Sequence, residues 1–126
     1  MLKNHESYDD YIKAIFLISK NNKGGWISNS EISHFLSVKP SSVTNMLYNL
    51  KEHKLIDWNP RKSIRLTKKG RERARMVLKR YNSLFDFFSQ VLKVQNKNII
   101  QKLSCEIEHY VNSDVCDALD KLVMKS

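Results

Sequence analysis

Residues 27 to 66, ISNSEISHFLSVKPSSVTNMLYNLKEHKLIDWNPRKSIRL, contain two short helical patterns followed by two strand-like runs. The first pattern has apolar residues at the i, i+3, i+4 spacing of one buried helical face, at Ile32, Phe35 and Leu36. Ser28 or Asn29 precedes it, and both are residue types that cap the first turn of a helix. The pattern therefore predicts a short amphipathic helix near residues 30 to 36.

A second helix is predicted from Pro40 to His53, after a break at residues 37 to 39. Proline suits the first turn of a helix, where its missing N–H costs nothing. The apolar stripe of this helix consists of Val43, Met46, Leu47 and Leu50. Its other face carries short hydrogen-bonding side chains and no carboxylate: Ser41, Ser42, Thr44, Asn45, Tyr48 and Asn49. Two helices joined by such a short turn predict a helix-turn-helix, with the second helix meeting base edges and phosphates in a major groove.

The two strand-like runs, residues 55 to 58 and 63 to 66, are separated by residues 59 to 62 with Pro60 at the tip. This pattern predicts a two-stranded hairpin, the wing of a winged helix, which either contacts DNA or only covers the helices. Its positive charge favours contact with phosphates or the minor groove. The residues predicted to bind DNA are Lys39, Pro40, Ser41, Ser42, Thr44, Asn45, Tyr48, Arg61, Lys62 and Arg65.

The net charge of +9 is unevenly distributed along the 126 residues. Residues 1 to 80 hold 17 Lys and Arg against 7 Asp and Glu, a net charge of +10, while residues 81 to 126 have a net charge of −1. Ten basic residues and one acid lie between Arg61 and Arg80. This concentration favours a polyphosphate partner over the alternative of a solvated basic helix, because it directly follows the helix-turn-helix pattern.

Size and composition limit the class of protein. A chain of 126 residues with 41% hydrophobic residues forms one ordinary domain, or a small domain with a helical arm. No apolar run approaches the roughly 20 residues of a membrane span, and the N-terminus lacks a secretory pattern, so we expect a soluble chain and a cytoplasmic location. Two cysteines, Cys105 and Cys116, indicate reduced thiols and not a disulfide framework.

The remaining segments are also helical patterns. Residues 8 to 20 predict a first helix with Ser7 as N-cap, and Thr67 is the expected N-cap of a long helix. From residue 74 to 92 apolar residues are too dense for one stripe, so part of that surface, including Phe87 or Phe88, is expected to pack on a second subunit. Residues 99 to 111 and 114 to 124 predict two more helices, with Asn112 and Ser113 between them. The predicted fold class is mainly α: a winged helix-turn-helix DNA-binding domain over residues 1–72, followed by an all-helical dimerisation region with a metal-binding role over residues 73–126.

Cys105, Glu108 and His109, in CEIEH, share one face of a predicted helix at i, i+3 and i+4. A thiolate, a carboxylate and an imidazole together suit a divalent transition metal better than magnesium or calcium. The alternative is a buried cysteine beside a solvated Glu/His pair, and the pattern alone favours that alternative.

Several motifs in this order resemble the metal-dependent repressors related to the diphtheria toxin repressor and the manganese transport regulators. The most specific are VKPSSVTNML, LTKKG and CEIEHYVNSDV, and the resemblance covers essentially the whole chain. It implies the short form of that family, a winged helix plus a helical dimerisation region without an SH3-like domain. It also implies a bound divalent cation that joins the first helix to the dimerisation region and sets the spacing of two recognition helices.

Carried over by residue, the resemblance implies metal ligands at Asp10, Cys105, Glu108 and His109. Four positions depart from the family: Tyr81 stands for a histidine, Phe85 for a glutamate, Gln101 for an ancillary histidine and Lys13 for an acid. These departures argue against a binuclear or second site, so at most one site per subunit is expected. Fe(II) or Mn(II) is the expected cofactor, with Zn(II) and Co(II) as alternatives, the cysteine favouring Fe(II), Zn(II) or Co(II). A metal-independent relative is the open alternative, since the Lys13 ammonium is able to replace the metal's charge.

These observations predict a homodimeric transcriptional regulator that binds double-stranded DNA and represses metal-uptake or metal-homeostasis genes. Neither a membrane nor a small-molecule substrate is expected as a partner. The alternatives are a metal-independent winged-helix regulator and a winged-helix module that binds protein or RNA. An enzyme is not expected, because the sequence has no phosphate-binding loop, no nucleophile elbow and no acid/base constellation around His5, His34 or His53.

Overall fold

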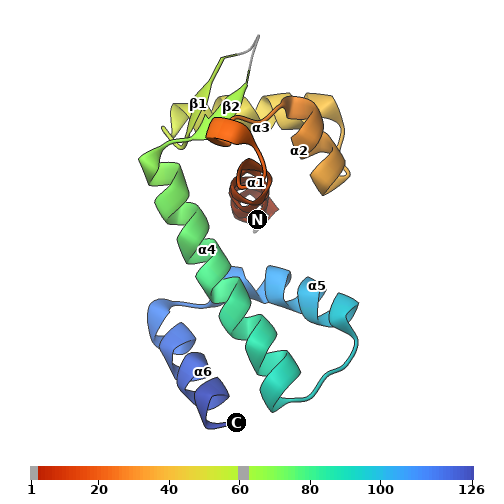
Figure 1. Cartoon of the computed structure of the whole chain (residues 1–126), viewed down its shortest axis with the longest axis vertical. Helices are drawn as coiled ribbons and strands as arrows, with labels where there is room; N and C mark the ends of the chain where they lie inside the picture. The colour runs from red at the N-terminus through yellow and green to blue at the C-terminus, as the bar shows by residue number, and fades with distance from the viewer. Residues whose placement is uncertain (1–2, 60–62) are drawn as a thin grey trace. The chain divides into compact units, whose positions relative to one another are not determined.

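The structure, a computed structural model, describes residues 3–59 and 63–126 (Figure 1). The chain divides into two compact units, Met1–Arg75 and Met76–Ser126. Each unit has its own hydrophobic core. The tip of the predicted wing, with Pro60, Arg61 and Lys62, lies outside the described residues.

The first unit is a winged helix (Figure 1). It comprises α1 (Lys3–Ser19), the 3-10 turn η1 (Lys23–Gly25), α2 (Asn29–Leu36), α3 (Pro40–Glu52), β1 (Ile56–Trp58), β2 (Ile64–Leu66) and the start of α4 (Lys68–Asp86). The strands are antiparallel with Ile56 opposite Leu66, and Ile27 bridges to Ile64 on the other side of β2. The predicted fold class is confirmed.

Local chemistry explains where the two helices of the helix-turn-helix begin and end. Ser28, one of the two predicted cap residues, caps α2, and it forms a reciprocal capping box with Glu31. Ser37 ends α2 in a left-handed conformation, with φ 55°. Pro40 then opens α3. The prediction that Phe35 is buried was wrong: it is 52% exposed, because an eight-residue helix turns only its Ile32 and Leu36 side toward the core.

The sequence predicted a cap residue for α1 and another for α4. α1 begins at Lys3, so Ser7 lies inside the helix and is not its N-cap. Thr67 caps α4 as predicted, accepting a hydrogen bond from the Gly70 N–H at 3.1 Å. A Cβ atom on Gly70 would lie 2.1 Å from the Leu55 carbonyl oxygen, so only glycine allows α4 to approach the hairpin this closely.

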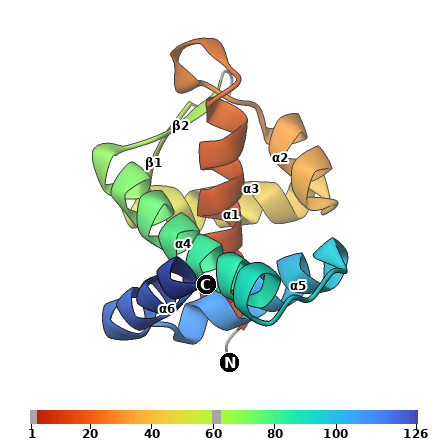
Figure 2. The same ribbon diagram turned by 60° about the horizontal axis from the view of Figure 1, so that its bottom comes forward.

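The second unit contains the end of α4, a π-helical turn η2 (Phe87–Val91), α5 (Lys97–Ile107), a 3-10 turn η3 (Glu108–Tyr110) and α6 (Ser113–Lys125). In both ribbon views α5 and α6 lie beside the end of α4, and α6 contacts η2 (Figure 2). Asn112, which was expected between the last two helices, caps α6, and its side-chain oxygen accepts a hydrogen bond from the Val115 N–H at 2.9 Å.

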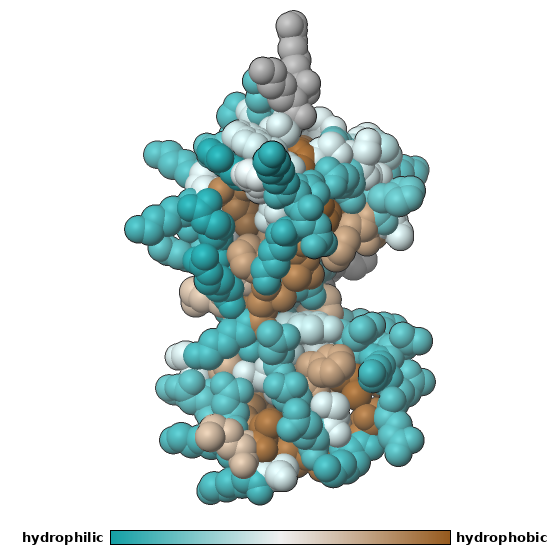
Figure 3. Space-filling model, viewed as in Figure 1, coloured by the Kyte–Doolittle hydropathy of each residue, from teal (hydrophilic) through white to brown (hydrophobic). Residues whose placement is uncertain are grey.

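The core of the second unit is small, with Leu84, Val111 and Cys116 buried. Figure 3 shows patches of hydrophobic residues exposed between hydrophilic ones on this unit. The exposed large side chains are Met76, Leu92, Ile99, Tyr110, Val115, Leu122 and Met124. Exposed apolar surface of this extent fits a unit that packs on another subunit.

Candidate nucleic-acid interface and metal centre

The two faces of α3 have the chemistry that the sequence predicts. Val43, Leu47 and Leu50 are fully buried against the core of the first unit. Ser41, Ser42 and Asn45 are exposed on the outer side. Tyr48 is 60% exposed and meets Trp58 of β1 edge to face, with ring centroids 4.7 Å apart. The outer face therefore presents hydroxyl and amide groups to solvent, with one aromatic ring that the wing holds in place.

Thr44 differs from the other predicted DNA-binding residues of this helix. It is half-buried, and its hydroxyl donates to the Pro40 carbonyl at 3.1 Å. The same oxygen accepts from the Asn29 side-chain amide at 3.0 Å, which ties α2 to α3. This structural contact was not predicted, because residue spacing alone does not give the crossing of two helices. Lys39, just before α3, is exposed.

Arg65 is the predicted wing residue that the structure describes. Its guanidinium lies over the Trp26 ring, 4.3 Å from the centroid, and 3.9 Å from the Asp57 carboxylate. The side chain is 43% exposed, so these partners orient the cation while leaving part of it accessible. Nothing in the sequence indicated the stacking on Trp26, which depends on the bridge between Ile27 and β2.

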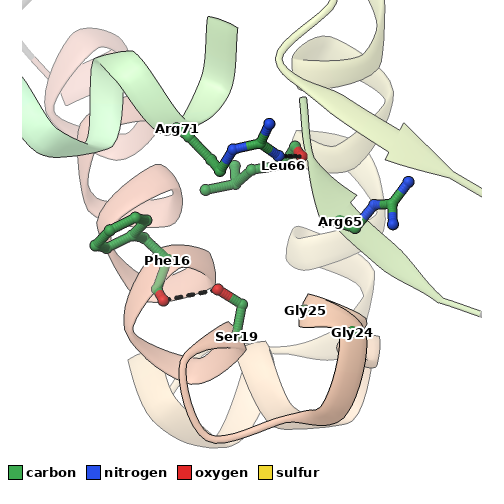
Figure 4. Close-up of a pocket in the computed structure, with 7 residues that line it drawn as sticks. All are labelled: Phe16, Ser19, Gly24, Gly25, Arg65, Leu66 and Arg71. Carbon is green, nitrogen blue, oxygen red and sulfur yellow. Dashed lines mark hydrogen bonds between the residues drawn. The ribbon is translucent and has the colours of Figure 1, made fainter. Parts of the chain in front are cut away.

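A surface pocket of about 400 Å³ lies beside the wing, lined by Phe16, Ser19, Gly24, Gly25, Arg65, Leu66 and Arg71 (Figure 4). Arg71 donates to the Leu66 carbonyl at 2.9 Å, and Figure 4 shows the Arg65 guanidinium directed away from Phe16 and Ser19. Both arginines thus have partners within the protein. Arg71 joins α4 to β2.

The CEIEH segment lies in the second unit and changes helix type within it. The sequence predicted one α-helix from residue 99 to 111, but α5 ends at Ile107 and Glu108 begins the 3-10 turn η3. Glu108 is 1% exposed. Its Oε1 lies 2.9 Å from His109 Nδ1, so the structure brings the carboxylate and the imidazole together. The alternative interpretation, in which Glu108 and His109 form a solvated pair, is therefore wrong about Glu108, which is buried.

Arg80 is the functional residue that sequence reasoning missed. Its Nε donates to Glu108 Oε2 at 3.0 Å and to the Glu108 carbonyl at 3.1 Å. The sequence placed Arg80 in the basic run expected to meet DNA, but its side chain is only 20% exposed and belongs to this buried group. A count of charges does not show which way a helical side chain points, and the partner is 28 residues away.

Cys105 is half-buried on the last turns of α5, near Tyr81 of α4. Burial raises the pKa of Tyr81 above its ordinary value of 10.0, and negative charge at Cys105 raises it further. Tyr81 therefore keeps its proton at neutral pH, when a phenol is a poor metal ligand. Its ring lies 6.1 Å from that of Phe85, and Gln101 is exposed. Tyr81 and Phe85, two of the positions that differ from the family, thus contact each other through their rings.

The donor chemistry of this segment fits a transition metal. Glu108 Oε1 and His109 Nδ1 are 2.9 Å apart, the distance of an ion pair or hydrogen bond between the two side chains. This separation is also close to the distance of about 3 Å between neighbouring ligands in octahedral coordination with bonds of roughly 2.1 Å. The half-buried thiol of Cys105 is a third donor on the same segment. Asp10 lies in the first unit, half-buried on α1, and its part in a site is a prediction of the resemblance alone. Its neighbour Asp9 is buried and pairs with Arg73, with Nε 3.3 Å from Oδ1.

Comparison with known proteins identifies both parts of the chain. The protein-family model described as iron dependent repressor, N-terminal DNA binding domain, matches residues 3–64. A second family model, iron dependent repressor, metal binding and dimerisation domain, matches residues 67–125. An uncharacterized HTH-type transcriptional regulator of Methanocaldococcus jannaschii is 30% identical over 114 residues, covering 90% of each chain. The chain belongs to the iron dependent repressor family.

Two further proteins similar to this chain are also regulators by name. The HTH-type transcriptional regulator MntR of Geobacillus kaustophilus is 30% identical over 117 residues, which cover 93% of this chain and 80% of that protein. The solved structure of the manganese regulator SloR has a TM-score of 0.78 and 26% identity over 94% of this chain. The chain spans about half of that structure, 54%.

As an iron dependent repressor family member, the chain has a DNA-binding first part and a metal-binding, dimerising second part, the domain composition of a metal-responsive transcriptional regulator. The predicted family, function class, cofactor class, DNA partner and dimerisation are thereby confirmed. Among the residues that the structure describes, none of the helices has the length and apolar character needed to cross a membrane.

Proposed function

We propose that the chain is a homodimeric repressor of metal-homeostasis genes that binds duplex DNA with α3 and the wing. The contacts come from Lys39, Pro40, Ser41, Ser42, Thr44, Asn45, Tyr48, Arg61, Lys62 and Arg65. Support comes from the exposed hydroxyl and amide face of α3 and from the oriented Arg65 cation. Hydroxyl and amide side chains can read base edges, and a cation such as Arg65 can contact phosphates.

One divalent transition metal per subunit controls this binding, with ligands from Cys105, Glu108 and His109 and a further ligand from Asp10. The observation that supports the site best is the buried Glu108 carboxylate held 2.9 Å from His109 Nδ1. Fe(II) and Mn(II) are the expected ions, because the relatives are named as iron and manganese regulators. A metal that binds the DNA-competent arrangement of the dimer more tightly raises DNA affinity, and a few kcal/mol of differential binding is enough.

One observation favours a second candidate function, a metal-independent regulator of the same kind. Arg80 already supplies the buried Glu108 carboxylate with a cation at 3.0 Å. In that case the ion pair is structural and DNA affinity does not depend on metal.

Titration of Fe(II), Mn(II), Co(II) and Zn(II) into metal-free protein, followed by DNA binding, separates the two candidates. The metal-responsive function predicts tighter DNA binding with at least one ion and loss of that response in His109→Ala. The metal-independent function predicts the same affinity with every ion and in both proteins.

A further inference from the structure

Arg80 makes two hydrogen bonds to one residue from a single nitrogen atom. Its Nε donates to Glu108 Oε2 at 3.0 Å and to the Glu108 backbone carbonyl at 3.1 Å. The bond to the backbone does not depend on how the Glu108 side chain rotates. Arg80 is therefore anchored to η3 itself, and the carboxylate oxygen that it holds is fixed relative to that turn.

Fixing Oε2 determines where the other oxygen lies. The Glu108 side chain is 2% exposed and the His109 side chain 7% exposed, so water contributes little to their orientation. With Oε2 on Arg80, Oε1 lies 2.9 Å from His109 Nδ1. A carboxylate torsion is broad when nothing holds it, and a ligand pair that is not held loses affinity for the metal.

We propose that Arg80 is the positioning residue of the metal site, holding Glu108 by Oε2 and by its carbonyl so that Oε1 and His109 Nδ1 stand at ligand separation. This inference rests on the proposed metal-responsive function. In this role Arg80 is not itself a ligand and acts through Glu108.

The opposite role is a cation that competes with the metal for Glu108. A competitor must leave the carboxylate when the metal arrives, and its removal would tighten metal binding. The bond to the Glu108 carbonyl opposes this role, because Arg80 stays on η3 whichever way the carboxylate turns. The two roles therefore predict opposite changes in metal affinity.

The test compares Co(II) binding by the full chain and by Arg80→Gln, using competition with a chelating dye and the visible absorption spectrum of bound Co(II). Lys79→Gln is the matched control. It removes a cation from the adjacent position of α4, where Lys79 is 61% exposed and 3.9 Å from Asp117. Arg80→Lys keeps the charge but loses the planar guanidinium, and it serves as the test if Arg80→Gln does not fold.

Arg80→Gln should lower Co(II) affinity about 10- to 100-fold and change the Co(II) spectrum, as expected for loss of a residue that orients a ligand. Arg80→Lys should recover part of the affinity, and Lys79→Gln should bind within about twofold of the parent. Unchanged or tighter binding by a folded Arg80 variant, with the parental spectrum, overturns the positioning role alone. A parent chain that binds no Co(II) overturns the proposed metal response together with this inference.

Discussion

Replacing Gly70 by alanine tests how α4 is joined to the wing. Intrinsic helix propensity predicts that Gly70→Ala stabilises the first unit by about 1 kcal/mol, because glycine is the weakest helix former after proline. The structure predicts the opposite sign. The added Cβ would lie 2.1 Å from the Leu55 carbonyl oxygen and 3.1 Å from Leu66 Cδ2. Backbone cannot move aside as a side chain can, so α4 must shift by about 1 Å relative to the hairpin to restore an ordinary contact.

That shift would break the hydrogen bond from the Thr67 N–H to the same Leu55 oxygen, now 3.0 Å. Overpacking costs about 1–3 kcal/mol and one lost hydrogen bond about 1 kcal/mol. After the gain in propensity, Gly70→Ala should lower the free energy of unfolding by about 1–3 kcal/mol.

Urea unfolding followed by tryptophan fluorescence measures this change, because both tryptophans, Trp26 and Trp58, lie in the first unit. Glu72→Ala, two residues along the same helix and exposed, should change the free energy of unfolding by less than about 0.5 kcal/mol. If Gly70→Ala is as stable as the parent or more stable, the close approach of α4 to Leu55 is refuted.

Two further predictions concern DNA. Arg65→Ala should weaken binding to specific and random duplexes alike and reduce the slope of log affinity against log salt by about 0.9, because it removes one phosphate contact. Lys121→Ala, an exposed cation on α6, is the control, and an unchanged slope in Arg65→Ala would remove this residue from the interface. Ser42→Ala and Asn45→Ala should each cost about 1–3 kcal/mol on a specific site selected from random duplexes and less on random DNA. Equal losses on both kinds of DNA would contradict a role in reading sequence.

The features of the fold that depend on neighbouring residues could be predicted from the sequence. Ser28 with Glu31 caps α2, Pro40 opens α3 and Thr67 caps α4, each through contacts within four residues. The hairpin followed from two apolar runs around a proline. These are the interactions that short motifs encode, and they were enough to predict the winged helix.

The parts that were missed depend on contacts between distant residues. Arg80 looks like one more cation of a DNA-binding run until its contact with Glu108 is known. The hydrogen bond from the Asn29 side-chain amide to the Thr44 hydroxyl depends on how α2 crosses α3, which the sequence did not show. The change from α5 to η3 at Glu108 also coincides with a long-range contact, since Arg80 donates hydrogen bonds to the carbonyl and to the carboxylate of that residue. The role of Glu108 and His109 as ligands stays a prediction, and the sequence did not indicate the contact between Arg80 and Glu108.

The most direct test of the account is the DNA affinity of the parent chain and of His109→Ala, each measured metal-free and with Fe(II), Mn(II), Co(II) or Zn(II). Metal should tighten DNA binding by the parent at least several-fold, and His109→Ala should bind with its metal-free affinity throughout. An affinity that no ion changes, with His109→Ala indistinguishable from the parent, would contradict metal control.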